Sequence, residues 1–210
     1  MRDSLVERLT STIAANVNGG LMDTANRLTV KDERQGRMAK LLSDSAISSH
    51  VCAFRGSYYW FDGEIYVEVG KDQLSLSLLN AMKLCAVTDA DICVRGKVIV
   101  EFCIKQIGIS TIEPSKGIIC FKNGVLNIDT EEFFNFSPDL HVTNKLEYEY
   151  DRTAKCPKWE SFLSEVLPDK EDESVLQEYL GVIFMDRSKF KLEKMLICIV
   201  TGKQIGRAHV

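Results

Sequence analysis

The sequence predicts an α+β fold in which helices are mixed with short antiparallel hairpins. Asp62-Gly63 and Asn123-Gly124 each separate two runs of β-forming residues, and such pairs readily adopt the positive φ angles of a tight hairpin turn. Elsewhere, apolar residues recur every third or fourth position, which is the spacing of one helix face. A short apolar run at residues 194–199 predicts a buried strand at the end of the fold.

The first 43 residues are predicted to be largely helical. Apolar side chains recur every fourth position over residues 4–17, and Asn18-Gly19-Gly20 is expected to end that helix. Residues 21–43 continue with a weaker helical period and contain five regularly spaced cations. These are Arg27, Lys31, Arg34, Arg37 and Lys40. On a helix they form one basic stripe, which is either a phosphate-contacting face or an ordinary solvated face that Asp32 and Glu33 dilute.

Over residues 58–107 the sequence predicts a hairpin, a helix and a segment of ambiguous type. Residues 58–61 and 64–67 are the two strands of the Asp62-Gly63 hairpin, and their aromatic residues fit either cross-strand packing or stacking on bases. Residues 72–86 are expected to be helical. Residues 92–107 fit either a strand or a helix, and the helical face would consist of Val94, Val98, Phe102 and Cys103.

Asp89 and Asp91 form a D-x-D carboxylate pair of the kind that can hold catalytic metal ions. Primases of the archaeal and eukaryotic type hold two metal ions with such a pair on a strand, where both carboxylates point to one side. Here the pair fits a turn or helix cap better, and no third carboxylate or base completes a nucleotidyl transferase site.

Residues 118–185 predict a second hairpin followed by two helices. The strands are residues 118–122 and 125–129, and alternation over residues 142–151 favours an edge strand. Pro157 is placed to begin a helix whose apolar stripe is Trp159, Phe162, Leu163, Val166 and Leu167. A helix from about residue 173 to residue 185 is expected to bury Val175, Leu176, Tyr179, Leu180, Ile183 and Phe184.

Composition narrows the functional class. The 210 residues are 45% hydrophobic and 27% charged, with a formal net charge of −4, which is unlike a dedicated basic nucleic-acid-binding domain. Seven cysteines without a C-x-x-C pair and three scattered histidines favour reduced thiols over a disulfide framework or a zinc site. With no signal-peptide core and no apolar run long enough to span a bilayer, we expect a cytoplasmic protein of the host cell with no membrane partner.

The end of the chain is similar to the entry of a phosphate-binding loop without completing one. After the predicted strand at residues 194–199, Gly202-Lys203 is followed by Gln204, where a magnesium ligand would be Ser or Thr. Ile197 stands where the loop needs its first glycine. We therefore expect no catalytic, cofactor or metal residues here.

An ordered set of motifs resembles the phage and plasmid primase–helicase family and its poxvirus relatives. The motifs are FKNGVLNIDT (121–130), SPD (137–139), VTNKLEYEYD (142–151), AKCPKW (154–159), LQEYLG (176–181) and KMLICI (194–199). In that family, such a middle domain directly precedes a superfamily 3 helicase, a hexameric AAA+ motor that unwinds DNA with ATP and magnesium.

The resemblance implies a domain organisation and a set of partners. Residues 1–117 would be an N-terminal α/β region, 118–193 the accessory domain, 194–199 the start of a truncated helicase domain and 200–210 a non-native tail. The phosphate loop would be missing after Ile199. The intact parent would bind DNA, ATP and magnesium and form a homo-hexamer, whereas this chain alone would not hydrolyse ATP. The alternative is a self-contained protein or DNA interaction module of a mobile element.

Overall fold

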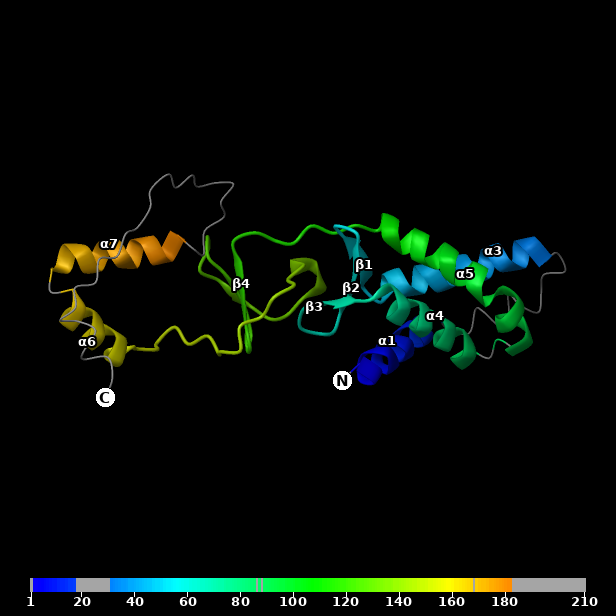
Figure 1. Ribbon diagram of the computed structural model, residues 1–210, viewed down its shortest axis with the longest axis horizontal. Coiled ribbons are helices and arrows are strands. Elements are labelled where there is room, and N and C mark those ends of the chain that lie inside the picture. Colours follow the sequence, from blue (N-terminus) through cyan, green and yellow to red (C-terminus); the bar gives the residue numbers. More distant parts are fainter. Residues whose placement is uncertain (1, 18–30, 86, 88, 168, 183–210) are drawn as a thin grey trace, which may run out of the picture. The chain divides into compact units, whose positions relative to one another are not determined.

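The chain folds into two units of mixed α and β structure. The computed structural model describes residues 2–17, 31–85, 87, 89–167 and 169–182, which contain six α-helices and two three-stranded antiparallel sheets (Figure 1). This confirms the predicted fold class. Unit 1 comprises Met1–Ser115 and Phe136–Asn144, and unit 2 comprises Lys116–Asn135 and Lys145–Val210. The units are therefore not contiguous in sequence.

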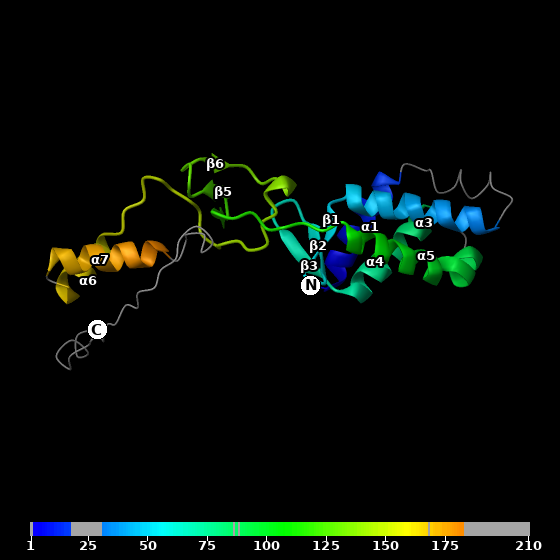
Figure 2. The same cartoon turned by 90° about the horizontal axis from the view of Figure 1, so that it is seen from above.

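Four helices form the core of unit 1, and Figure 2 shows them lying alongside one another. Their buried side chains include Leu9, Leu42 and Leu78, each with no exposed surface. The helices predicted over residues 4–17 and 72–86 are confirmed, and the segment 92–107, which fitted either a strand or a helix, is helical. The four helices are α1 (Arg2–Asn16), α3 (Lys31–Ser48), α4 (Lys71–Leu84) and α5 (Asp89–Ile109).

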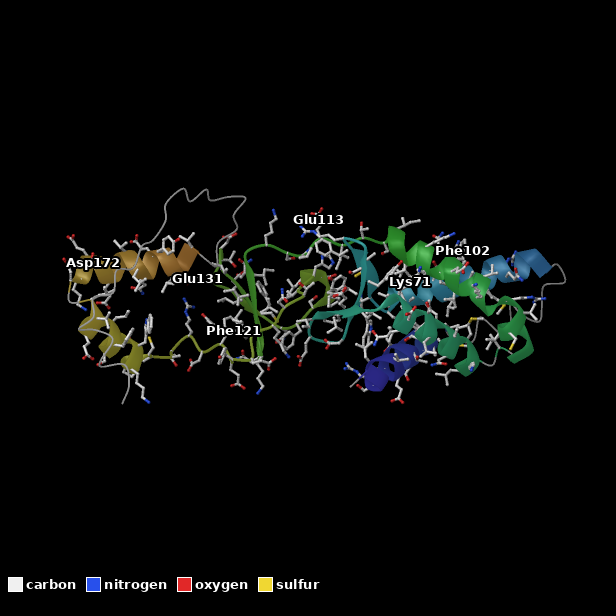
Figure 3. All side chains as sticks on the ribbon, in the orientation of Figure 1. Lys71, Phe102, Glu113, Phe121, Glu131 and Asp172 are labelled. Carbon is white, nitrogen blue, oxygen red and sulfur yellow. The ribbon has the colours of Figure 1, made fainter. Side chains whose placement is uncertain are left out.

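The predicted apolar face of α5 is wrong in most of its members. Val94 and Val98 are 78% and 59% exposed, and Phe102 (Figure 3) is 42% exposed. The face that packs into the core is instead formed by Ile99, Val100, Cys103, Ile104 and Ile107. Because α5 carries apolar residues on both sides, helical spacing alone does not identify the buried one.

The sheet of unit 1 has the order β1-β2-β3, with β1 (Val51–Phe54), β2 (Ser57–Phe61) and β3 (Tyr66–Val69). The predicted hairpin is confirmed, but its loop is longer than the predicted two-residue turn. Phe61 pairs with Tyr66, so four residues form the loop, and the Asp62 carboxylate accepts from the N–H groups of Glu64 and Ile65.

Strand β1 was not predicted. It pairs with β2 through a two-residue turn at Arg55 and Gly56, since Phe54 pairs with Ser57. Both turn residues have positive φ, 50° for Arg55 and 85° for Gly56, as a tight turn between twisted strands requires. Beyond α5, the N–H of Ala53 donates to the carbonyl of Ser110 (2.9 Å), and the N–H of Ile112 donates to the carbonyl of Ala53 (3.1 Å).

The sheet of unit 2 contains β4 (Ile118–Phe121), β5 (Gly124–Asn127) and the unpredicted β6 (Phe133–Phe134). The predicted second hairpin is confirmed, although its turn lies one residue earlier than predicted. Phe121 pairs with Gly124, so Lys122 and Asn123 are the turn residues. The Asn123 side chain accepts from the N–H of Tyr150 (2.8 Å) and donates to its carbonyl (3.0 Å).

The edge strand predicted over residues 142–151 is not a strand. Residues 145–150 run beside β4 with only isolated backbone hydrogen bonds. The N–H of Leu146 donates to the carbonyl of Cys120, and the N–H of Lys122 donates to the carbonyl of Tyr148, both at 2.8 Å. Residues 136–144 belong to unit 1, where the N–H of Tyr66 donates to the carbonyl of Val142 (2.7 Å). The segment divides between two units, which prevents a continuous ladder.

The two predicted C-terminal helices are confirmed as α6 (Pro157–Val166) and α7 (Lys170–Gly181). Pro157 occupies the first turn of α6, and the Asp169 carboxylate caps α7 by accepting from the N–H of Glu171 (2.9 Å). The predicted burial is largely wrong: Leu163 is buried, but Trp159, Phe162 and Val175 are exposed. In the part of the chain that the structure describes, α6 and α7 pack against each other and leave these side chains uncovered.

Several predicted features lie outside the described residues. These are the C-terminal part of the last helix, the strand at residues 194–199, and Gly202-Lys203.

We expect Gly124→Ala to destabilise the sheet of unit 2. Gly124 has φ of 152°, and a Cβ there would lie 2.6 Å from Cζ of Phe133 and from the carbonyl oxygen of Phe134. The free energy of unfolding measured by urea denaturation should fall by more than about 1 kcal/mol. Gly181→Ala in α7 is the control, because a Cβ there meets nothing within 4 Å. Equal stability of the two variants would contradict the packing described for Gly124.

Candidate functional site

The basic stripe predicted near the N-terminus lies partly on α3. Arg37 and Lys40 are exposed one turn apart, while Met38, Ala39 and Leu42 between and beyond them are buried. Neither cation has a hydrogen bond or ion pair to another described residue. Lys31 and Arg34 belong to the first turns of α3, and Arg27 lies outside the described residues. The structure therefore places two of the five predicted cations on one solvent-exposed helix face.

Burial of the opposite face fixes how α3 presents these cations. The hydroxyl of Ser45 donates to the carbonyl of Ile13 on α1 (2.6 Å), and the thiol of Cys103 on α5 donates to the carbonyl of Ala39 (3.2 Å). Both contacts are buried, so rotation of α3 about its axis would break them and expose apolar side chains. The pair Arg37 and Lys40 is thus held outward by packing.

Asp89 and Asp91 do not have the geometry of the catalytic pair. Both lie in the first turn of α5 rather than on a strand. Among the residues that the structure describes, no group of three His, Cys, Asp or Glu side chains could hold a metal ion. The strand geometry required by the nucleotidyl transferase alternative is therefore not present.

A cavity of about 660 Å³ in unit 1 was not predicted from the sequence. It is bounded by α1, the turn after α3, and the end of β2 with its loop. Arg8 of α1 contributes a guanidinium whose Cζ lies 5.2 Å from the centroid of the Trp60 ring, and it donates to the carbonyl of Asp62 (2.7 Å). His50 and Phe61 lie in edge contact at the same wall, with ring centroids 6.0 Å apart.

Several polar groups of this cavity lack partners among the described residues. Trp60 is 4% exposed, and its indole N–H has no hydrogen-bond acceptor. The side chains of Glu7 and Ser48 also make no hydrogen bond, whereas the amide of Asn16 donates to the hydroxyl of Ser49 (2.8 Å). Burying a donor without an acceptor is unfavourable, and this N–H has essentially no accessible surface of its own. The local sequence signal for this cavity is the short run Trp60-Phe61-Asp62-Gly63, which contributes four of its lining residues.

A second cavity, of about 550 Å³, lies between α6 and α7 in unit 2. Its wall combines the apolar side chains of Trp159, Leu163 and Leu176 with the carboxylates of Glu160 and Glu173. The stacked rings of Trp159 and Phe162 have centroids 5.7 Å apart. This helix pair therefore presents an apolar surface with an acidic rim.

Comparison with known protein families shows which family the chain belongs to. Residues 37–168 match the family described as D5 N terminal like, a span of more than half the chain that takes in α3 from Arg37, both sheets and α6. The chain belongs to the D5 N-terminal-like family. This is the N-terminal domain of phage and viral D5-like primase–helicase proteins, which act in replication. A comparison with curated proteins found no match.

The D5 N-terminal-like match begins earlier than the resemblance inferred from the motifs, which covered residues 118–199. It includes most of unit 1, so residues 37–117 are part of the family domain rather than a separate addition. Within the described residues, no helix combines the length and apolar character needed to cross a membrane.

The described cysteines form no disulfide with one another and differ in their environments. Cys93 and Cys156 are exposed, whereas Cys52, Cys103 and Cys120 are buried. Burial raises the pKa of Cys52 from 9.0 to about 11 and that of Cys103 from 9.0 to about 12. The reactive thiolate forms of these two groups are therefore suppressed at neutral pH.

We expect iodoacetamide at about pH 8 to modify Cys93 and Cys156 and to leave Cys52 and Cys103 unmodified. Raising the pH toward about 11 or 12 should increase reaction at the buried pair, because their thiols lose protons only there. Peptide mass spectrometry measures each site. Labelling in guanidinium is the control, in which all four should react alike, and native labelling of Cys103 at the rate of Cys93 would contradict the assignment.

Proposed function

We propose that this chain is the accessory part of a phage- or plasmid-type replicative primase–helicase and that it engages single-stranded DNA. The observation that carries the proposal is the D5 N-terminal-like match over residues 37–168. It is supported by the outward pair Arg37 and Lys40, which lies at the start of that span. The chain as a whole is acidic, so DNA contact would depend on a local basic face rather than on net charge.

The contact would be made with phosphates rather than with base edges. Arg37 and Lys40 are exposed cations with no competing partner among the described residues, and both are long enough to reach a strand lying across α3. Lys31 and Arg34 continue the same spacing in the sequence. Each phosphate that such a cation neutralises releases a counterion, which makes binding weaken as salt rises.

In the same proposal, an ATP-hydrolysing motor of superfamily 3 follows the strand predicted at residues 194–199. ATP and magnesium would bind to that motor, and copies of the whole protein would assemble as a homo-hexamer. Gly202-Lys203 lacks the surrounding residues of a phosphate loop, so no residue of this chain is assigned to ATP or magnesium. The accessory domain would support assembly or guide the DNA.

The surface between α6 and α7 favours a second candidate function, that of a protein interaction module. Trp159 and Phe162 are 46% and 47% exposed and lie side by side. Aromatic side chains beside Glu160 suit an apolar, basic protein surface better than they suit DNA, because that carboxylate would repel phosphates. Glu173 is already paired with Lys170 (2.7 Å).

We expect the double variant Arg37→Ala/Lys40→Ala to bind single-stranded DNA more weakly and with less salt dependence. Losing two phosphate contacts should reduce the slope of log K against log salt by roughly 1.4, at about 0.7 per contact on a single strand. Fluorescence anisotropy with a labelled oligonucleotide at several salt concentrations measures the slope.

The matched control for this experiment is Lys83→Ala/Lys97→Ala, which removes two exposed cations from α4 and α5 and leaves α3 unchanged. It should keep the wild-type slope except for a small general charge effect. Equal slopes for the two double variants would contradict a phosphate-contacting role for α3.

A further inference from the structure

We propose that the cavity between α1 and the end of β2 is a nucleobase-binding site. The inference rests on the proposed function for the source of the base, a single strand of DNA, and assigns a site separate from the cations of α3. The cavity volume of about 660 Å³ lies within the range of small-molecule sites. Three features of its lining select a planar, uncharged ligand with hydrogen-bonding edges.

The first feature is a stacking surface. The guanidinium of Arg8 lies over Trp60 with Cζ 5.2 Å from the ring centroid, and the Arg8 side chain is exposed. A planar guanidinium held against an indole has a second face on which an aromatic ring can stack. Bases taken out of a stack are commonly held against aromatic rings or arginine planes.

The second feature is a pair of exposed polar side chains in the lining, Glu7 and Ser48, that make no hydrogen bond to other described residues. The carboxylate of Glu7 is an acceptor, and the hydroxyl of Ser48 can act in either role. A nucleobase carries both ring acceptors and amino or imino donors at its edges, so it matches this mixed set. A purely apolar ligand would leave all of these groups unpaired.

The third feature is the balance of charge. Glu7 and Asp62 bring two carboxylates to the lining and Arg8 brings one guanidinium. Arg8 is already engaged with the Asp62 carbonyl and the Trp60 ring. A phosphate entering here would meet more carboxylates than free cations, so the site selects the base and leaves the backbone of the strand to other surfaces.

The test uses the full chain with Trp159→Phe, so that Trp60 is its only tryptophan. The probes are a labelled deoxythymidine 12-mer, an abasic 12-mer of equal length and charge, and free thymidine. We expect the thymidine oligomer to alter Trp60 emission and to bind roughly 5- to 150-fold more tightly than the abasic oligomer, which is the range for stacking one base. Thymidine at millimolar concentration should alter the emission in the same direction.

Two variants locate the binding, and both are checked for folding by circular dichroism and thermal unfolding. Arg8→Lys keeps the positive charge and removes the plane, so the preference for thymidine over abasic oligomer should be lost. Ser48→Phe introduces bulk from an exposed position and should abolish the emission change. The matched control is Arg55→Lys, because Arg55 also lies over an aromatic ring, Phe54 at 5.0 Å, but does not line the cavity.

Measurable binding of the thymidine and abasic oligomers with equal affinity, equal behaviour of Arg8→Lys and Arg55→Lys, or no emission change with either thymidine probe would each overturn the inference. In those cases, a salt slope that falls in Arg37→Ala/Lys40→Ala would leave the proposed function intact. Conversely, a thymidine response that Ser48→Phe abolishes, in a protein that binds neither oligomer, would support the base site and reject DNA engagement.

Discussion

The burial of one face of α5 is the constraint on which the rest of unit 1 depends. Ile99, Cys103 and Ile107 are almost fully buried against α3 and α4. Gly96 permits close approach to α4, since a Cβ there would lie 3.0 Å from Cδ2 of Leu79. The end of α5 then joins the sheet through the two hydrogen bonds that Ala53 exchanges with Ser110 and Ile112. The packing of α5, together with the segment that follows it, therefore holds the helices and the sheet of unit 1 in place.

This constraint also determines which side chains remain available to a ligand. With Ala39 and Leu42 committed to the core, α3 can present only its opposite face, where Arg37 and Lys40 lie. Ser45 of α3 fixes α1 through the carbonyl of Ile13, and Asn16 fixes the end of α1 to Ser49. The same packing therefore holds the basic face and the α1 wall of the cavity, although they are separate surfaces.

The sequence predicts where helices and strands lie better than it predicts which of their faces are buried. Regular spacing was sufficient for α1, α4 and α6, because each has a recognisable apolar period and a helix start or stop signal. On α5, Val94 and Val98 share the spacing of the residues that are in fact buried, and only tertiary packing chooses between the two faces. The Asn123-Gly124 signal located a hairpin but not its register, because Asn123 is engaged by the backbone of Tyr150, 27 residues further along the chain.

The candidate sites were predicted only where they are local in sequence. Arg37 and Lys40 belong to one helix, so their spacing reveals a common face. The cavity combines Arg8, Ser48 and Trp60, which no single-sequence period relates, and its unpaired indole N–H is a property of packing alone. The first turn of α7 contains Glu171, Asp172 and Glu173 (Figure 3 labels Asp172). Carboxylates there repel phosphates. For this reason the proposed DNA contact is placed on α3, and a protein partner is proposed for the exposed aromatic residues of α6.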